Sequence, residues 1–430
     1  MSSPLNTCLI GVDGWADVHY SDLLRQQAKG AVRILGATII NAPDVPEKCA
    51  RLRAVGCELF NDYKVMIDCL GAKTDLCFIP TGIHFHAPMT IAALRSGANV
   101  YVEKPAAATI QDVRAMQQCE EETGRFVAVG YQTMYAREAL WMKQAILDGK
   151  IGAIQSIKSR GLWPRFDTYY HRNNWAGRLR NGDAWILDSP FNNAIAHQLN
   201  MICFLAGLEL ERTAELESIQ AELYRARNIE SPDTACMRIL TRAKVPLYFF
   251  VTHSSQGKID PEITVQGERG SIRWTFSTAQ LTVGSHTETI PCETHQELRD
   301  SVMARLFRRV KDPSTFVCNL DIAAAQTLCT NGAHDSSPVH LIGPEFVLRE
   351  PASHASKTIV AGLDDVIECA FATGKLFSEL GVPWARPGRV VSLVDYTWFP
   401  GNSANVSSIP EGARKMSLPL SGNPKTHVTG

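Results

Sequence analysis

The chain has 430 residues, in which 43 basic side chains nearly balance 44 acidic ones and leave a formal net charge of −1. With 45% apolar and 20% charged residues, the composition is typical of a globular protein, and the length indicates two or three domains. This balance excludes the strongly charged surface of a nucleic-acid or membrane-surface protein, and no apolar run is long enough to span a membrane.

Strand-like and helix-like stretches alternate strictly through the first 130 residues. The strands are expected at residues 7–12, 32–40, 57–60, 75–80, 99–102 and 126–130. Helices are expected up to residue 29 after the first strand, and then at residues 46–55, 63–70, 86–96 and 109–124. This order predicts an α/β domain with a doubly wound parallel sheet, the Rossmann arrangement, over residues 1–130.

The pattern changes after about residue 150. Consecutive strand-like runs occupy residues 156–163, 217–227, 235–241, 246–253, 262–266 and 271–275, which predicts a large, mostly antiparallel sheet. Helical patterns return at residues 295–309 and 356–380. We therefore expect a second, α+β domain over residues 131–400, followed by an extended or poorly ordered tail rich in Ser, Asn, Pro and Gly over residues 401–430.

Twelve cysteines are scattered through the chain, mostly within apolar runs, and none form a C-x-x-C pair. This usage predicts reduced, buried thiols in a cytoplasmic protein. The stretch before the first strand is too short and polar for a signal peptide, which favours the same location.

A glycine-rich turn joins the first strand to the first helix. Gly11, Asp13, Gly14, Trp15 and Ala16 are its candidate cofactor contacts, because such a turn lets the backbone approach a pyrophosphate at a helix N-terminus. Only the first and last positions of the G-x-G-x-x-G/A pattern fit, and Asp13 is unfavourable beside a pyrophosphate unless its side chain turns away or caps the helix. An ordinary strand-to-helix turn remains the alternative.

The end of the second strand should select between NAD and NADP. It holds Asn41, which we expect to face the ribose, and Asp44 lies beyond a proline. The choice stays open, but NAD is favoured because no basic cluster awaits a 2′-phosphate.

The strand at residues 99–102 ends in Glu103, Lys104 and Pro105. Ligands bind at the carboxyl ends of strands in open α/β sheets, so Lys104 is placed where it could hydrogen-bond a hydroxyl that is being oxidised. The peptide bond between Lys104 and Pro105 is a candidate for the cis form. Taken alone, such a tripeptide is more often a surface turn.

Further motifs surround this lysine: TGIHFH at residues 81–86, AAL at 92–94, Gly97, GYQ at 130–132 and ILDGKIG at 146–152. Together with Glu103-Lys104-Pro105, they closely resemble the glucose–fructose oxidoreductase / inositol dehydrogenase / rhizopine catabolism (Gfo/Idh/MocA) family. The resemblance is close from about residue 7 to 205 and is one of architecture alone up to about residue 385.

The resemblance implies an NAD(P)-dependent enzyme that oxidises a hydroxyl of a sugar or polyol without a metal, and that forms a homodimer or homotetramer through its large sheet. Lys104 matches the lysine that contacts the reacting hydroxyl, and Glu103 and His86 match residues near the nicotinamide ribose. Trp163 and Arg165 resemble a pair that reaches over the nicotinamide. By the same resemblance, the remaining cofactor contacts are expected at Thr81, His84 and Gln132.

The sequence departs from the family at the catalytic histidine. The family carries an Asp followed four residues later by a His; Asp188 aligns with the Asp, but Asn192 stands at the His position and has no pKa suited to proton transfer. His197, four residues after Asn193, could replace it if a helix begins at Pro190. Otherwise His197 is a core histidine.

If His197 lies in the core, Lys104 must handle the proton together with Asp188, Tyr131 or Tyr169, or the reaction differs. Residues 163–178 combine aromatic side chains with Arg, Asn and Asp, which suits a carbohydrate better than a loop with buried aromatics. The expected substrate contacts are Tyr131, Arg165, Tyr169, Arg172, Asn192 and Asn193.

Three functions are compatible with these residues. The favoured one is hydride transfer between a nicotinamide and a sugar or polyol, with Lys104, His197 and Asp188 as catalytic residues. The second is redox-neutral chemistry on tightly bound NAD, such as glycoside cleavage or epimerisation through a keto intermediate. The third is a non-catalytic sensor of sugar or NAD, which Asp13 and Asn192 favour and Lys104 and Asp188 oppose.

Overall fold

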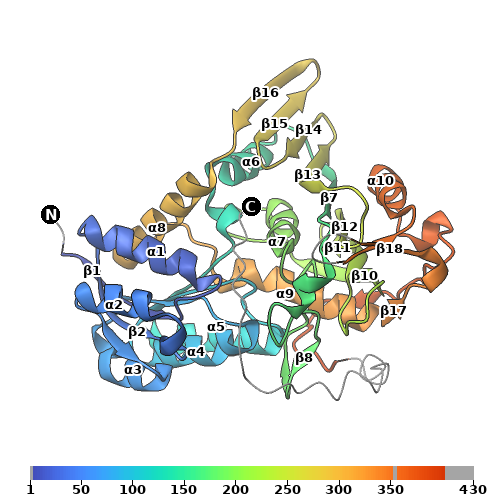
Figure 1. Ribbon diagram of the computed structural model, residues 1–430. Helices are drawn as coiled ribbons and strands as arrows, with labels where there is room; N and C mark the ends of the chain where they lie inside the picture. Colours follow the sequence, from blue (N-terminus) through green and yellow to red (C-terminus); the bar gives the residue numbers. More distant parts are fainter. Residues whose placement is uncertain (1–2, 352–355, 402–430) are drawn as a thin grey trace.

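The N-terminal part of the chain is a Rossmann domain. In the computed structural model, which describes residues 3–351 and 356–401, six parallel strands lie in the order β3-β2-β1-β4-β5-β6 (Figure 1). The strands are β1 (Leu5–Ile10), β2 (Val32–Thr38), β3 (Glu58–Phe60), β4 (Leu76–Ile79), β5 (Asn99–Val102) and β6 (Val127–Val129). The helices between them are α1 (Ala16–Ala28), α2 (Pro46–Ala54), α3 (Tyr63–Leu70), α4 (Ile83–Arg95) and α5 (Ile110–Thr123).

Every expected strand and helix of this domain is present, and the predicted fold class is confirmed. Strands β4 and β5 are buried at every position, as expected for central parallel strands covered on both faces. Helix α5 begins at Thr109, whose side chain accepts from the Asp112 N–H, and ends at Gly124 in the left-handed region (φ +62°). The two capping residues explain why its ends were predictable to within one residue.

The second part of the chain is built on a ten-stranded sheet whose main path runs β16-β15-β14-β13-β7-β12-β11-β10-β17. Its strands are β7 (Ile154–Leu162), β10 (Leu216–Arg225), β11 (Thr234–Thr241), β12 (Pro246–Thr252), β13 (Ile259–Gly267), β14 (Gly270–Trp274), β15 (Thr278–Val283), β16 (His286–Pro291), β17 (Val339–Leu341) and β20 (Val391–Ser392). The pairs β12–β7 and β10–β17 are parallel and the other pairs are antiparallel, so the sheet is mixed but mostly antiparallel.

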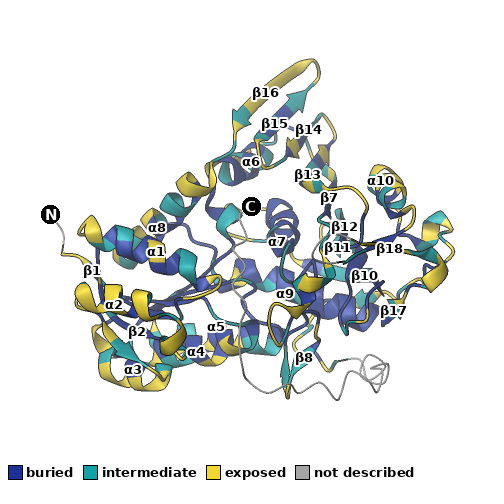
Figure 2. Cartoon of the chain, in the orientation of Figure 1, coloured by how far each residue is buried: buried dark blue, intermediate teal, exposed yellow. Residues whose placement is uncertain are grey.

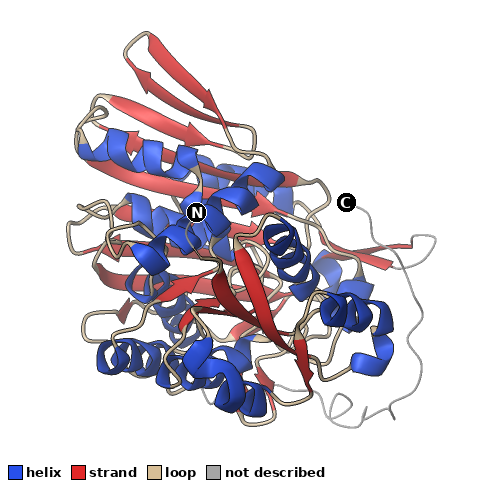
Figure 3. Cartoon of the chain, turned by 90° about the vertical axis from the view of Figure 1, so that its left-hand side faces the viewer, coloured by secondary structure: helices blue, strands red, loops and turns tan. Residues whose placement is uncertain are grey.

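Both faces of this sheet are covered near its centre. Helices α6 (Arg137–Leu147), α7 (Ala196–Leu205) and α9 (Leu320–Ser336) belong to the main core, and α10 (Leu363–Thr373) packs in a second core on β7, β10, β11 and β12. Figures 1 and 3 show the hairpin of β15 and β16 projecting from one end of the molecule. Strand β16 is exposed, whereas α7 is buried (Figure 2).

One expectation for the C-terminal part was wrong, and one helix was not anticipated. The segment expected as one helix at residues 356–380 is instead strand β19 (Ser356–Val360), paired with β18 (Val347–Pro351), followed by α10. Gly362, at φ +70°, separates the strand from the helix. Helix α9 was not anticipated, because it is buried on nearly all sides and lacks the polar stripe that marks a surface helix (Figure 2).

Helix α8 (His295–Lys311) and α9 return from the second part of the chain to the Rossmann domain. The Asn331 side chain accepts from the Ile110 N–H and donates to the Ala108 carbonyl, both at 2.8 Å. Arg25 of α1 pairs with Asp300 at 2.7 Å. Because these contacts join the two parts of the chain, the expected domain limits of 1–130 and 131–400 remain predictions. The expected tail at 401–430 lies, apart from Gly401, outside the described residues.

All twelve cysteines are free, and all but Cys69, Cys292 and Cys369 are buried. None of the helices within residues 3–351 and 356–401 is long and apolar enough to cross a membrane. In the same part of the chain, no group of three His, Cys, Asp or Glu side chains is arranged to hold a metal ion.

Candidate active site

The turn between β1 and α1 leaves room for a phosphate. Gly11 has φ +97° and Gly14 has φ +62°, and a Cβ at Gly14 would meet no atom within 4 Å. Gly11 lies over Ala16, since a Cβ on Gly11 would be 3.6 Å from the Ala16 Cβ. The backbone shape and the open space above Gly14 therefore fit a dinucleotide at the N-terminus of α1.

Asp13 is turned towards Lys48 of α2. The Lys48 Nζ lies 3.1 Å from Asp13 Oδ1 and 2.7 Å from Asp17 Oδ1, and it also donates to the Val12 carbonyl at 2.8 Å. The hydrogen bond from Lys48 lowers the pKa of the Asp13 carboxyl. Asp13 thus shares the Lys48 ammonium with Asp17, which offsets part of its negative charge in the turn.

Glu103 is buried beside the turn and is paired with His19 of α1. The His19 Nε2 lies 2.8 Å from Glu103 Oε1, and the Lys104 N–H donates to Oε2 at 3.1 Å. Burial alone would raise the pKa of Glu103, but the contacts with His19, Lys104 and the Trp15 indole lower it to about 2. Gly130 packs tightly against this carboxylate, because a Cβ there would lie 3.0 Å from it and would press on the Glu103 side chain. Glu103 therefore holds a fixed negative charge at this end of the sheet.

His86 joins the two loops that follow β4 and β5. Its ring nitrogens contact the carbonyl oxygens of Pro105 at 2.8 Å and Thr81 at 3.1 Å, and the residue has no exposed surface. Burial lowers the pKa of His86, and the two carbonyl contacts oppose this shift in part. The structure thus places His86 beneath the loops as a support, and the Lys104–Pro105 bond that it contacts is cis.

Lys104 lies at the centre of a hydrogen-bonded chain. Its Nζ donates to the Asn193 backbone carbonyl at 2.8 Å and to Asn193 Oδ1 at 3.0 Å. The Asn193 amide donates to Asp188 Oδ1 at 2.9 Å, and Asp188 Oδ2 accepts from the Gly177 N–H at 2.7 Å. Burial lowers the pKa of Lys104 and raises that of Asp188. A lysine ammonium has three donors, so one remains for a ligand.

His197 lies in the same neighbourhood at the start of α7. Burial, and then the nearby charge of Lys104, lower the pKa of His197 to about 3. Its ring packs edge-on against Tyr131 with 5.7 Å between centroids, and its Nδ1 has no hydrogen-bond partner within the described residues. The expected helix start at Pro190 was wrong: α7 begins at Ala196, and looser turns precede it. These turns, rather than a helix face, bring Asp188 and Asn193 to Lys104.

Asn192 and Tyr131 lie in the core and do not reach this chain of contacts. The Asn192 amide donates to the carbonyls of Ile186 and Leu187, both at 3.1 Å, and its Oδ1 accepts from Gln326 at 3.0 Å. The Tyr131 hydroxyl donates to Gln326 Oε1 at 2.9 Å. Both residues are fully buried. Their expected role in substrate binding is corrected to a structural one, because every polar group of these two side chains already has a partner inside the protein.

The aromatic and basic side chains of residues 163–172 form a stacked group. The guanidinium carbon of Arg165 lies 5.5 Å from the Trp163 ring centroid and 4.9 Å from that of Tyr169, and Arg172 lies 3.8 Å from the Tyr169 centroid. Trp163 also stacks on Phe276 at 6.0 Å, and its indole N–H donates to Asp260. The structure thus brings together Trp163, Arg165, Tyr169 and Arg172, and their contacts with cofactor and substrate stay a prediction.

The remaining expected cofactor contacts lie around the same edge of the Rossmann sheet. His84 contacts Asn181 at 3.5 Å, where the small β8–β9 hairpin (Arg180–Asn181 and Ala184–Trp185) approaches the loop after β4. The Thr81 hydroxyl contacts the Met89 sulfur. Asn41 is half-buried just after β2, and Gln132 is half-buried at the start of a short 3-10 helix (Gln132–Tyr135) after β6.

Sequence reasoning missed two partners at this site, His19 and Lys48. Both are polar residues on helices α1 and α2, and they neutralise or hold acidic residues that come from loops elsewhere in the chain. No motif marks them. The only available signal was the presence of two acids, Asp13 and Glu103, that needed partners.

Comparison with known proteins places the chain in a family. The model described as the oxidoreductase family with an NAD-binding Rossmann fold matches residues 5–131, and the Gfo/Idh/MocA C-terminal domain matches residues 139–273. The fold and the site thus define an oxidoreductase of the NAD-binding Rossmann class. The chain belongs to the Gfo/Idh/MocA family.

Among curated relatives, inositol 2-dehydrogenase of Klebsiella pneumoniae subsp. pneumoniae is 24% identical over 243 residues, which cover 55% of this chain and 66% of the relative. D-glucoside 3-dehydrogenase of Escherichia coli is 26% identical over 162 residues, 37% of this chain and 44% of the relative. The chain therefore matches two thirds or less of the length of these relatives.

Solved structures show the same fold. Levoglucosan dehydrogenase in complex with NADH gives a TM-score of 0.65 at 16% identity, covering 77% of this chain and 96% of that one. The WlbA dehydrogenase from Bordetella pertussis, in complex with NADH and UDP-GlcNAcA, gives a TM-score of 0.60 at 20% identity, covering 77% and 97%.

Proposed function

We propose that this chain is an NAD-dependent dehydrogenase that oxidises a hydroxyl group of a sugar or polyol. The observation that carries the proposal is the position of Lys104 at the carboxyl end of β5, with its Nζ bonded to both oxygens of Asn193 and one donor left for a ligand. The family membership and the named relatives, which are sugar and polyol dehydrogenases, support the same reaction class.

The side chains around Lys104 divide the work of alcohol oxidation between them. A bound nicotinamide supplies the hydride acceptor. The free donor of Lys104 holds the substrate hydroxyl and stabilises negative charge that develops on its oxygen. His197 is the proposed proton acceptor, because it lies close to Lys104 and its Nδ1 has no hydrogen-bond partner in the described part of the chain. Its pKa of about 3 keeps the imidazole neutral at physiological pH but makes it a weak base, so the transfer relies on Lys104 stabilising the alkoxide as it forms.

Asp188 and Asn193 position the lysine. The Asp188 carboxylate is oriented by the Gly177 N–H and accepts from the Asn193 amide, which leaves Asn193 Oδ1 facing the Lys104 ammonium. Tyr131 takes no part in proton transfer, because its hydroxyl is committed to Gln326.

NAD is the proposed cofactor rather than NADP. Lys48 is the basic residue near the end of β2, and Asp13 and Asp17 already neutralise it. Asp44 and Glu47 are exposed in the same region. A 2′-phosphate would therefore meet a net negative charge, whereas a ribose hydroxyl would not.

We further propose that the protein is cytoplasmic and forms a homodimer or homotetramer. Twelve free cysteines, nine of them buried, suit a reducing compartment. The chain's own α10 covers the sheet at β7 and β12, so the open part available to a second copy is at β14 to β16.

Absorbance at 340 nm tests the reaction. The purified protein is incubated with NAD or NADP and a panel of sugars and polyols, and reduced cofactor is measured together with substrate conversion. Net formation of NADH with one substrate is the expected result. Conversion without a net change in cofactor would contradict a dehydrogenase and favour redox-neutral chemistry, and no cofactor binding at all would favour a sensor.

A further inference from the structure

The stacked residues beside Asp188 carry two positive charges, those of Arg165 and Arg172, and this one carboxylate does not balance both. Arg172 donates from Nη1 to the Tyr169 carbonyl at 2.7 Å, and its guanidinium carbon lies 3.8 Å from the Tyr169 ring centroid and 5.2 Å from that of Trp175. This fixes the side chain, which is only 27% exposed, in one place.

Asp188 is the only carboxylate paired with Arg172 within the described residues, and the pair is loose. The Arg172 Nη2 lies 3.8 Å from Asp188 Oδ2, beyond hydrogen-bonding distance, whereas that oxygen already accepts from the Gly177 N–H at 2.7 Å. Arg165 adds a second guanidinium 4.9 Å from the Tyr169 ring, and its buried Nε has no partner in the described part of the chain.

The other acids nearby are already engaged. Asp167 and Asp233 bind Arg227 at 2.8 and 3.2 Å, and Arg349 also faces Asp167. Glu103 contacts His19 and keeps its negative charge beside Lys104. Lys104, Arg165 and Arg172 therefore carry three positive charges against the two negative charges of Glu103 and Asp188, which leaves the site with an excess of one positive charge.

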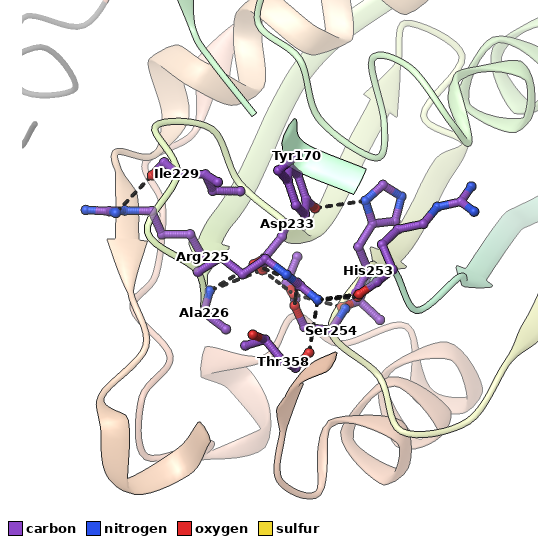
Figure 4. Close-up of polar contacts among 12 residues, drawn as sticks. Tyr170, Arg225, Ala226, Ile229, Asp233, His253, Ser254 and Thr358 are labelled. Atoms are coloured by element: carbon purple, nitrogen blue, oxygen red, sulfur yellow. Dashed lines mark hydrogen bonds and ion pairs between the residues drawn. The ribbon is translucent and has the colours of Figure 1, made fainter. Parts of the chain in front are cut away.

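The segment that carries these arginines is held rigidly from behind. Arg227 donates to the Arg165 carbonyl at 2.8 Å, and the Tyr170 hydroxyl contacts His253 Nδ1 at 3.1 Å. Figure 4 shows this group, with Tyr170 directed towards the His253 ring and Asp233, Ser254 and Thr358 gathered below. Binding an anion here would need little rearrangement of the segment, which favours affinity.

We propose that the substrate oxidised at Lys104 is a sugar or polyol that carries an anionic group, a carboxylate or a phosphate, and that Arg172 binds this group. The inference rests on the proposed function for the reacting hydroxyl. Asp188 connects the two places: its Oδ1 faces Asn193 and Lys104, and its Oδ2 faces Arg172. The charge of Arg172 also lowers the pKa of Lys104, so the two cations lie near one another.

Matched pairs of neutral and acidic sugars test this specificity. Glucose is compared with glucuronate and with glucose 6-phosphate, and methyl β-glucoside with methyl β-glucuronide, at constant ionic strength. We expect kcat/KM for an anionic member to exceed that of its neutral partner roughly 10- to 100-fold, which corresponds to one charge-assisted hydrogen-bonded contact. The uronates and the phosphate distinguish the two kinds of anion.

Arg172→Met should reduce the ratio of anionic to neutral kcat/KM to near one, and Arg172→Lys should restore part of it. Arg178→Met is the matched control, because Arg178 is exposed on the same segment, and it should leave the ratio intact. A preference for the neutral sugar in every pair, or an equal ratio in Arg172→Met and wild type, would overturn the inference.

Calorimetric binding of glucuronate and glucose 6-phosphate to the NADH-loaded protein separates this inference from the proposed function. If no sugar is oxidised but one of these anions binds with an affinity that depends on Arg172, the proposed reaction fails and the anion site stands. If neither anion binds more tightly than glucose, the anion site fails, whatever the oxidation assay shows.

Discussion

Replacing Asn193 with alanine removes the link between Lys104 and Asp188. Two hydrogen bonds to charged groups are lost, from Lys104 Nζ at 3.0 Å and to Asp188 Oδ1 at 2.9 Å, while the Lys104 bond to the backbone carbonyl remains. Water can replace part of these contacts because Asn193 is half-buried. We expect a loss of about 2 to 3 kcal/mol in the transition state, or roughly 30- to 150-fold in kcat/KM.

The neighbouring Asn192 provides the control, because its amide bonds lie entirely in the core. Asn192→Ala leaves the buried carbonyls of Ile186 and Leu187 without the Asn192 amide, while Gln326 keeps the Phe191 carbonyl and the Thr330 hydroxyl as acceptors. We expect it to lower the free energy of unfolding by about 3 to 5 kcal/mol. At temperatures where the variant is folded, kcat should change by less than about threefold.

Steady-state kinetics and denaturant unfolding are measured on both variants. If the site lies around Asn193, Asn193→Ala loses activity and keeps a nearly normal free energy of unfolding. Asn192→Ala then keeps its activity and loses stability. If Asn192→Ala loses activity without losing stability, the residue at the family's histidine position acts in catalysis, and the placement of the site around Asn193 is refuted.

Three further predictions concern the proton acceptor, the cofactor and a buried lysine. His197→Ala should lower kcat by about 10²- to 10⁴-fold. Because the pKa of His197 is about 3, the pH profile of wild-type kcat/KM should show no titration of His197 between pH 5 and 7. A rise or fall of kcat/KM near pH 6.5 that disappears in His197→Ala would contradict this. The double variant Asp13→Asn, Asp17→Asn leaves Lys48 unpaired, so the ratio of NADP to NAD kcat/KM should rise by about tenfold, and an unchanged ratio would mean that Lys48 does not face the ribose. Burial lowers the pKa of Lys143 to about 7, well below its value in the unfolded chain, so between pH 7 and 10 the unfolded state holds the extra proton and raising the pH stabilises the fold. The difference in unfolding free energy between wild type and Lys143→Met should therefore move in favour of wild type from pH 7.5 to pH 9, by up to about 1.4 kcal/mol per pH unit, and no movement would show that Lys143 keeps an ordinary pKa.

The Rossmann domain and the place of Lys104 could be predicted because the signals are local. The spacing of apolar residues along the chain is enough to identify a buried strand, a turn and an amphipathic helix. In such a sheet, ligands bind at the carboxyl ends of the parallel strands. The family resemblance extended this to an NAD-binding oxidoreductase of the Gfo/Idh/MocA family, which the family models then matched.

The details of the site could not be predicted, because they depend on contacts between distant segments. Asn192 lies in the core, where Gln326, 134 residues away in the sequence, completes its hydrogen bonds. The helical periodicity around Asn192 cannot predict a contact with so distant a residue. His19 and Lys48 are placed by the packing of α1 and α2 against the loops. The C-terminal errors have a similar origin, since α9 is buried too completely to show an amphipathic pattern.

The most direct test of the account is the Lys104→Met variant, measured for turnover and for cofactor binding on the same preparation. Lys150→Met, which removes an exposed lysine, serves as its control. We predict that Lys104→Met lowers kcat at least about 10³-fold while the Kd for NADH, followed by nicotinamide fluorescence, stays within about threefold of wild type. Turnover within about tenfold of wild type would contradict the assignment of Lys104 as the residue that holds the reacting hydroxyl.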